Sequence, residues 1–437
     1  MHASHRHFIS ITASIIIGTL GVAAAFNWLV DPFNLYDSPR FTGISAKKPL
    51  AYFYEPQTKS YALERLRPSG LILGNSRANF GLDPMMAPWS GKGYNAAYGG
   101  GSFNGAIFYF QRALSGGRLK QVVLAIDIDM FRKGKRSLAP LQFGVDDFFQ
   151  EAGKERILWS RQPRISWWAP LLSYGATEAS IATLRCQSAR EQFILLKSGM
   201  VDVDLAQARD TARQRVIAFE NRYLKFLYHP DENGKASLGV AKWKVESFKQ
   251  ILRLAHKENI GLIVLINPSH ARKYELYRAA GVVTTIQEWK RLLVRVNNEE
   301  AQRAMRGPFP IWDFEGYNRY TTERVPESDN MGENMQWYIE GSHYRRELGD
   351  LVLARIFGRD SNSEENISDF GTSINTSNIE SHFRYIELSR KEYARTHSKD
   401  VRDIEALAHA ASNMAKTGET RDMNESHSND DAACHVN

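Results

Sequence analysis

The stretch LILGNSRANFGLDP, Leu71–Pro84, contains the pattern from which the fold can be predicted. Its apolar start is typical of a buried strand, and Gly74 and Asn75 then break that pattern just before a serine. In open α/β sheets, ligands bind in the loops that leave the carboxyl ends of the strands. Ser76 stands in such a loop, so two interpretations compete: a helix N-cap or a nucleophile that a base must activate.

Short apolar segments and helix-like patterns alternate along the chain. The apolar segments have the length and near-continuous hydrophobicity of buried parallel strands, and they are 69–74, 121–129, 260–267 and 310–314. The helix-like patterns follow them at 103–114, 241–257, 284–305 and 345–357. A further short strand is expected around GYNAAY, residues 93–98. This alternation predicts an α/β fold with a doubly wound parallel sheet.

Composition divides the chain into three parts. Residues 1–30 form an apolar amino-terminal segment, and 31–358 form the α/β domain, in which the alternation stops at about 130–240. We expect a mainly helical insertion there, lying over the carboxyl edge of the sheet. Residues 359–437 are rich in Ser, Asn, Glu and His, which predicts an acidic, largely disordered tail interrupted by one amphipathic helix at roughly 386–414.

The amino-terminal segment from Phe8 to Val30 carries no charged residue. A helix of that length can cross a hydrocarbon core of about 30 Å. The alternative is a cleaved signal peptide, because Ala23, Ala24 and Ala25 offer small residues to a peptidase. We favour a retained anchor because the apolar run is long for a signal core, and either interpretation exports the rest of the chain.

Charge is unevenly distributed. From Arg359 onward there are 9 Lys and Arg against 15 Asp and Glu, while the preceding residues carry 47 against 34. A basic body suits an acidic partner such as a polyanionic sugar or anionic lipid, although scattered charge also serves solubility alone. Export and the diffuse charge argue against nucleic acid as a partner. Neither a phosphate-binding glycine loop nor a metal-binding motif stands in the sequence, so we expect no cofactor and no metal.

A candidate base for the serine stands far downstream, in WYIEGSHYRRELGDLVLARIF, Trp337–Phe357. Glu340 and His343 lie three residues apart, just before the last strongly patterned helix of the α/β domain. A short turn can bring the carboxylate to one ring nitrogen while the other ring nitrogen faces the nucleophile. Asp313, which ends the last predicted strand, is the second candidate for the acidic member.

Together the blocks resemble a known family. LILGNSRANFGLDP, YNAAYGGGSFNGAIFYFQRAL, KQVVLAIDIDMF, LIVLINPSHARKYEL, PIWDFEGYN and EGSHYRRELGDLVLARI occur in this order over roughly 66–358. The combination resembles the SGNH-hydrolase superfamily, especially its membrane-anchored, exported members related to alginate O-acetyltransferase components. This resemblance implies a three-layer α/β/α, flavodoxin-like domain with Ser76 as nucleophile and His343 as general base. It puts Glu340 where the family usually has aspartate.

The same resemblance suggests further site residues. Gly100 and Gly101 match the block that supplies an oxyanion-hole glycine. The third block normally provides an asparagine, but this chain has Asp127 and Asp129 there, and an ionised carboxylate repels an oxyanion. We expect Asn104 to substitute as a donor.

Neighbouring side chains offer candidate ligand contacts. Arg77 follows the serine and could bind an anionic sugar carboxylate, and His270 follows a predicted strand end and could line the same cleft. Trp167 and Trp168 could stack on sugar rings, but adjacent tryptophans more often serve packing and interfaces.

These observations predict an exported serine acyl-transfer enzyme, held by one helix in the bacterial inner membrane with its catalytic domain in the periplasm. Its substrates would be an acyl donor and an extracellular polysaccharide or cell-envelope glycan, and its partners would be other polysaccharide-modification proteins. The sequence leaves open an O-acetyltransferase or an O-acetylesterase. The alternative is a catalytically weak scaffold that binds glycan or partners, which the aspartates of the third block favour.

Overall fold

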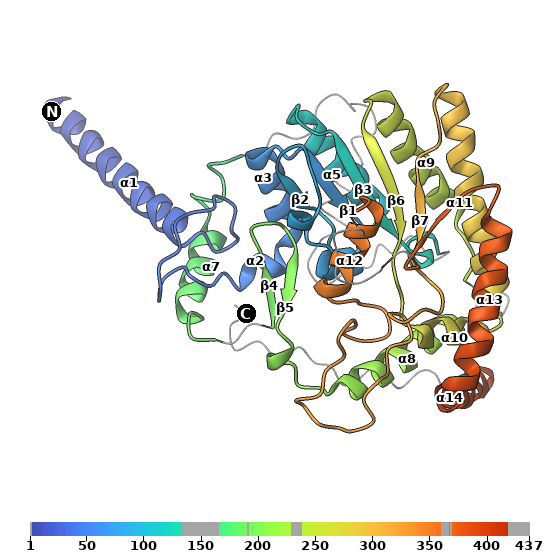
Figure 1. The fold of residues 1–437 in the computed structure, drawn as a ribbon. Helices are drawn as coiled ribbons and strands as arrows, with labels where there is room; N and C mark the ends of the chain where they lie inside the picture. Colours follow the sequence, from blue (N-terminus) through green and yellow to red (C-terminus); the bar gives the residue numbers. More distant parts are fainter. Residues whose placement is uncertain are drawn as a thin grey trace.

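A six-stranded sheet forms the centre of the protein (Figure 1). The computed structural model describes residues 2–132, 166–189, 192–228, 238–359, 367 and 369–417. The strand order is β2-β1-β3-β6-β7-β8, with β8 antiparallel to β7 and the other neighbours parallel. The strands are β1 (Gly70–Leu73), β2 (Gly93–Asn95), β3 (Gln121–Ile126), β6 (Gly261–Ile266), β7 (Ile311–Asp313) and β8 (Thr372–Ile374). The chain order reverses between β1 and β3, which makes the carboxyl ends of these two strands the topological switch point.

Helices cover both faces of the sheet, and this explains why its strands are apolar throughout. Leu71 and Leu73 point into one core, and Ile72 between them points into the other. The larger core contains the helices α3 (Glu55–Leu66), α5 (Phe103–Ser115), α9 (Lys242–Lys257), α10 (Ala271–Ala279) and α11 (Val283–Arg303). The smaller core contains α4 (Ser76–Gly81) and α12 (Arg346–Ile356). The predicted α/β class and mostly parallel sheet are confirmed, and the strand expected around GYNAAY is β2.

The insertion differs from the prediction of a mainly helical segment. Its described part contains α7 (Tyr174–Arg185), 3-10 turns and α8 (Ala212–Tyr228), but also an antiparallel hairpin of β4 (Phe193–Leu195) and β5 (Val201–Val203). Each hairpin strand has only three residues, which is too short for a period of two to stand out in the sequence. Residues 133–165, 190–191 and 229–237 of the predicted insertion lie outside the described residues.

The predicted disordered tail requires the largest correction. After Arg359 the chain adds β8 to the sheet and then forms α13 (Ile379–Thr396) and α14 (Ser398–Thr417), two helices instead of one (Figure 1). Apolar residues at helical spacing, including Ile379, Phe383 and Ile386, are buried in the larger core. The one helix predicted at roughly 386–414 captured part of this pattern, but the many charged residues hid its start at Ile379 and its division into two helices. The rest of the predicted tail, 360–366, 368 and 418–437, lies outside the described residues.

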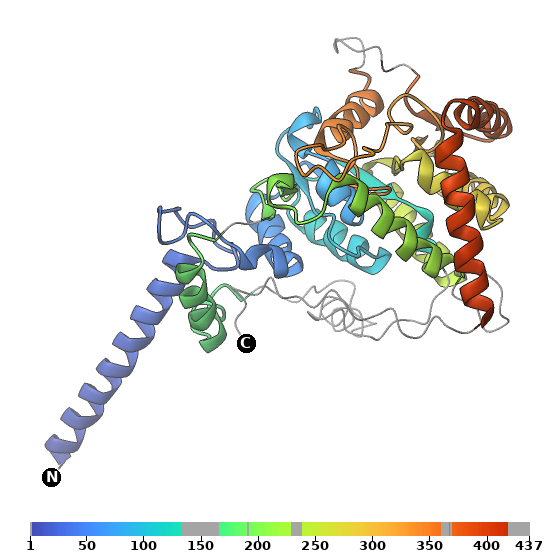
Figure 2. The ribbon, with the colours of Figure 1, turned by 90° about the horizontal axis from the view of Figure 1, so that it is seen from below.

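The amino-terminal helix α1 (His2–Val30) projects away from the body (Figure 2). It is long and apolar enough to cross a membrane. A polar turn fixes its end, because buried Asp31 accepts the backbone N–H of Leu35 at 2.7 Å and pairs with Lys48 at 3.2 Å. Lys48 Nζ also donates to the carbonyl oxygens of Val30 and Asp31, the cation placement that suits a helix carboxyl terminus. The hydrogen bonds and the ion pair of Asp31 and Lys48 therefore fix the carboxyl end of α1 to the body. Also before β1, a short helix α2 (Leu50–Phe53) leads into α3.

Candidate active site

The structure brings Ser76, His343 and Glu340 into contact. Ser76 is the first residue of α4, and Asn75 caps this helix by accepting the backbone N–H of Arg77 at 3.1 Å. The Ser76 hydroxyl lies 2.8 Å from His343 Nε2, and His343 Nδ1 lies 2.5 Å from Glu340 Oε1. Residues 267 positions apart thus form a serine, histidine and carboxylate chain at the carboxyl end of β1.

The carboxylate determines how the histidine works. Glu340 Oε1 also accepts the backbone N–H of His343 at 2.6 Å, which fixes the turn. Burial raises the pKa of Glu340. The charge interaction with His343, the two hydrogen bonds that Glu340 accepts from His343 and the charge of Arg77 together lower this pKa by more, so the net shift is downward. The ionised carboxylate therefore holds the proton on Nδ1 and leaves Nε2 to accept from the Ser76 hydroxyl. The histidine side chain is 23% exposed, so solvent reaches the site.

The glycine run lies against the end of β1. A Cβ on Gly101 would stand 2.2 Å from the Gly74 carbonyl oxygen, so this position needs glycine. The N–H groups of Gly99 and Gly101 are engaged, by Glu55 Oε2 at 3.3 Å and by the Tyr98 carbonyl at 3.0 Å. Between them, Gly100 has a φ of 68°, in the left-handed region.

The available oxyanion donors differ in part from the expected set. Among the described residues, the backbone N–H groups of Ser76 and Gly100 make no hydrogen bond, whereas the N–H of Gly101 closes its own turn. Asn104 is exposed on the first turn of α5 and makes no side-chain hydrogen bond within the described chain. The geometry therefore favours Ser76 and Gly100 as donors over Gly101 and Asn104.

The two aspartates of the third block are neutralised. Asn75 Nδ2 donates to Asp127 Oδ2 at 2.5 Å, and Arg77 pairs with Asp127 at 3.4 Å and with Asp129 at 2.9 Å. Lys273 adds a second cation to Asp129 at 3.2 Å. Burial raises the pKa of Asp129, but Lys273 and Arg77 lower this pKa by more. Both carboxylates are therefore committed to this ion-pair cluster instead of standing uncompensated beside the serine.

Arg77 is placed differently from the expectation of a substrate contact. It is only 4% exposed, and its guanidinium donates from Nε to Ser342 Oγ at 3.1 Å and from Nη1 to Ser269 Oγ at 3.4 Å. Since Ser342 precedes His343, this arginine ties the segment of Ser76 to the segment of His343. Its burial argues for a positioning role.

His270 is also turned inward. It is 1% exposed and caps α10, because Nδ1 accepts the backbone N–H of Arg272 at 3.2 Å. Nε2–H then donates to the Glu323 carbonyl at 2.7 Å. Burial lowers the pKa of His270 to about 4. A neutral, fully bonded cap is unsuited to ligand binding.

Asp313 belongs to another buried cluster. Its carboxylate lies 2.7 Å from Lys290 Nζ and 2.8 Å from His382 Nε2, and Lys290 also pairs with Glu315 at 3.0 Å. This cluster ties β7 to α11 and α13. The histidine that contacts Ser76 is hydrogen-bonded to Glu340 and not to Asp313, as the short spacing of Glu340 and His343 predicts.

Aromatic side chains stand beside the triad. The Phe80 ring lies 5.2 Å from the His343 ring and 5.8 Å from that of Phe193, which the β4–β5 hairpin contributes. Tyr52 stacks on Phe193 at 5.0 Å. All three aromatic rings are partly exposed. They form an aromatic wall on one side of the histidine.

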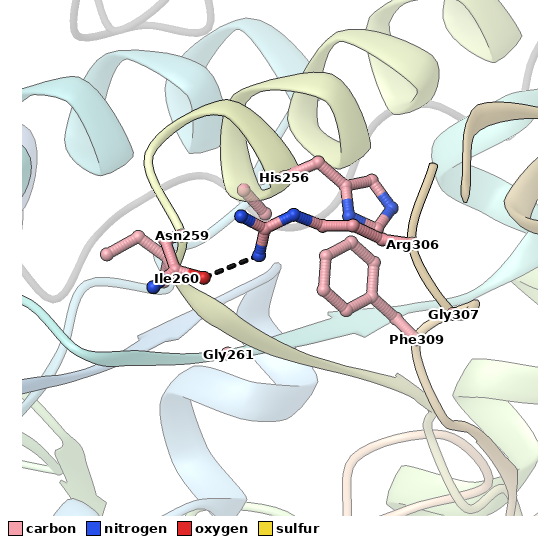
Figure 3. Close-up of a pocket in the computed structure, with 8 residues that line it drawn as sticks. His256, Asn259, Ile260, Gly261, Arg306, Gly307 and Phe309 are labelled. Carbon is pink, nitrogen blue, oxygen red and sulfur yellow. Dashed lines mark hydrogen bonds between the residues drawn. The ribbon is translucent and has the colours of Figure 1, made fainter. Parts of the chain in front are cut away.

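A cavity of about 410 Å³ lies away from this site, at the amino end of β6 (Figure 3). His256, Arg306 and Phe309 line it, and the His256 ring stacks on Phe309 at 4.1 Å. Figure 3 shows Arg306 reaching across to Asn259. In a doubly wound sheet, ligands bind at the carboxyl ends of the strands, so this cavity is on the wrong edge for the serine chemistry.

No protein-family model matches the chain, and no curated protein matches it. Among the described residues, no three His, Cys, Asp or Glu side chains are grouped to hold a metal ion.

Proposed function

We propose that the protein is an SGNH-type serine acyl-transfer enzyme, either an O-acetyltransferase or an O-acetylesterase. The contact of Ser76 with His343, and of His343 with Glu340, carries this proposal. In support, the serine opens a helix at the switch point of the sheet, where backbone N–H groups are available to an anion.

The proposed reaction has two halves. His343 Nε2 takes the hydroxyl proton while Ser76 Oγ attacks the acyl carbonyl carbon, and the N–H groups of Ser76 and Gly100 stabilise the oxyanion. Each such donor typically lowers the barrier by about 3 kcal/mol. The leaving alcohol takes the proton from His343 and departs, leaving an acyl ester on Ser76. Water or a glycan hydroxyl then attacks this ester and gives its proton to His343, which passes a proton to Ser76 Oγ as the acid or the acylated glycan departs.

The proposed glycan substrate is an extracellular polysaccharide or cell-envelope glycan, which carries the acetyl group if the enzyme is an esterase and accepts it from an acyl donor if the enzyme is a transferase. The basic body suits an acidic polymer. The partly exposed aromatic wall of Tyr52, Phe80 and Phe193 offers apolar surface beside the histidine, which the Phe80 ring contacts. With α1 as a single span of the bacterial inner membrane, the proposed location of the domain is the periplasm.

A second candidate is a scaffold with weak catalysis that binds glycan. The engaged N–H of Gly101 favours it, because this donor is not available to an oxyanion without a change in its turn.

Hydrolysis of p-nitrophenyl acetate by the full chain in detergent micelles tests the enzyme proposal. We expect turnover that Ser76→Ala and His343→Ala abolish, whereas the exposed-serine control Ser381→Ala retains it. Adding acetyl-free glycan distinguishes the two enzymes, since a transferase acetylates the glycan and an esterase only releases acetate. Turnover unaffected by Ser76→Ala, or absent from folded wild type, favours the scaffold.

A further inference from the structure

Large apolar side chains are exposed around the start of α7. Trp168 is 74% exposed, Leu172 49% and Tyr174 81%, all within seven residues. Single exposed apolar residues are normal on a protein surface, whereas a contiguous group marks an interaction site. Trp167 next to them is accounted for, because its ring packs on Tyr61 at 5.0 Å.

This segment is fixed to the end of α1. Asn27, 2% exposed, donates from Nδ2 to the Leu171 carbonyl and to Thr177 Oγ1, both at 2.9 Å. Ser180 Oγ donates to Asn27 Oδ1, also at 2.9 Å. Both ribbon views show α7 beside the carboxyl end of α1 (Figures 1 and 2). The position of α7 along the α1 axis is therefore set.

The length of α1 places this contact at the membrane surface. The uncharged residues begin at Phe8, and a helix rising about 1.5 Å per residue needs about 20 residues to cross the hydrocarbon core. That span ends near Asn27. A helix hydrogen-bonded to Asn27 consequently lies at the level of the lipid headgroups, together with Trp28, which is 44% exposed.

We propose that Trp28, Trp168, Leu172 and Tyr174 form a juxtamembrane surface that inserts into the interfacial region of the lipid bilayer. Tryptophan and tyrosine suit this region because they combine an apolar ring with a polar tip. Exposed Arg185 at the end of α7 adds a cation for anionic headgroups. The body is then attached at two points, so its orientation on the membrane is fixed. This inference rests on α1 crossing the membrane, and not on the chemistry proposed at Ser76.

Photolabelling in vesicles tests the surface. The full chain is reconstituted into phosphatidylcholine and phosphatidylglycerol vesicles that contain a phospholipid with a diazirine near the headgroup, and adducts are mapped by mass spectrometry. We expect adducts on α1 and, several-fold above background, on peptides covering 166–181. Met305, which is 93% exposed in the body, provides the background. The triple variant Trp168→Ser, Leu172→Ser, Tyr174→Ser should lose the second set of adducts, whereas Met305→Ser should keep both.

Three results overturn the proposal. Adducts on α1 with only background labelling of 166–181 show that lipid does not cover the surface. Crosslinks between two copies through this segment, without lipid adducts, assign the surface to a second copy of the chain. Absence of adducts on α1 itself contradicts the membrane span on which the inference depends.

Discussion

Replacing Arg77 with methionine should both destabilise the protein and lower the reactivity of Ser76. Methionine keeps much of the volume but removes both ion pairs of the guanidinium, to Asp127 and Asp129, and its hydrogen bond to Ser342. The segment of His343 then loses its hydrogen bond to the segment of Ser76. We therefore expect a variant that folds less stably and reacts more slowly even when folded.

The magnitude follows from what remains around the two carboxylates. Breaking a buried ion pair by removing one partner typically costs about 3–5 kcal/mol. Lys273 still pairs with Asp129, and Asn75 still donates to Asp127, so compensation is partial. The free energy of unfolding should therefore fall by about 3 kcal/mol. This loss is large, because a typical domain has a free energy of unfolding of about 5–15 kcal/mol. Arg77→Lys keeps the positive charge but lacks the planar guanidinium that contacts both carboxylates at once, so we expect about half that loss.

Urea unfolding of the full chain in detergent micelles, followed by near-ultraviolet circular dichroism, measures the stability. The rate of fluorophosphonate labelling, under conditions where each variant is folded, measures the second effect. Arg324→Met is the matched control, because that arginine is 77% exposed and its ion pair with Glu327 lies on the surface. Wild-type stability and labelling in Arg77→Met would refute the positioning role.

Three further predictions follow from the site and its neighbours. Glu340→Gln should fold normally but slow p-nitrophenyl acetate turnover by about a hundredfold to ten-thousandfold, because His343 loses the carboxylate that fixes its tautomer; unchanged turnover contradicts the triad. Burial raises the pKa of Asp350 to about 7, so this carboxyl binds more protons in the folded state between about pH 4 and 7, and its contribution to stability falls as pH rises through that range. Asp350→Asn should remove this slope and gain about 1–2 kcal/mol at pH 8 but little at pH 4, as urea midpoints can show; an equal gain at both pH values argues against a titration effect. Gly101→Ala should cost about 1–3 kcal/mol, because its Cβ meets the backbone at the end of β1, whereas Gly99→Ala, which meets nothing within 4 Å, should not; equal melting temperatures contradict the close approach.

The sequence predicts the sheet well because both of its faces are covered. Buried parallel strands are apolar at every position, so runs such as 121–126 and 261–266 stand out against the amphipathic helices between them. The hairpin of β4 and β5 and the strand β8 were not predicted, because each strand has only three residues and lies in a segment whose composition indicated helix or disorder. The helices α13 and α14 were predicted only in part, as one helix at roughly 386–414, because their buried stripe is narrow and many charged residues surround it.

The part of the candidate site that lies within one short stretch of sequence could be predicted. Glu340 and His343 share one turn, so their spacing just before the last helix of the α/β domain suggests their contact. The roles of Asn75, Ser342 and Lys273 depend on contacts between distant segments, and a single sequence does not show these. Burial also decides function: Arg77 and His270 stand at strand ends as expected, but they point inward.

Covalent labelling of Ser76 tests the central claim most directly. The full chain in detergent micelles is treated with a fluorophosphonate, and the modified residue is identified by mass spectrometry in wild type, Ser76→Ala and His343→Ala. The full chain is required, because β8, α13 and α14 pack on the domain that ends near Gly358. A serine activated by His343 predicts one adduct, on Ser76, that is absent from both variants. A folded wild type without an adduct, or an adduct that survives His343→Ala at the same rate, would contradict the proposed acyl-transfer chemistry.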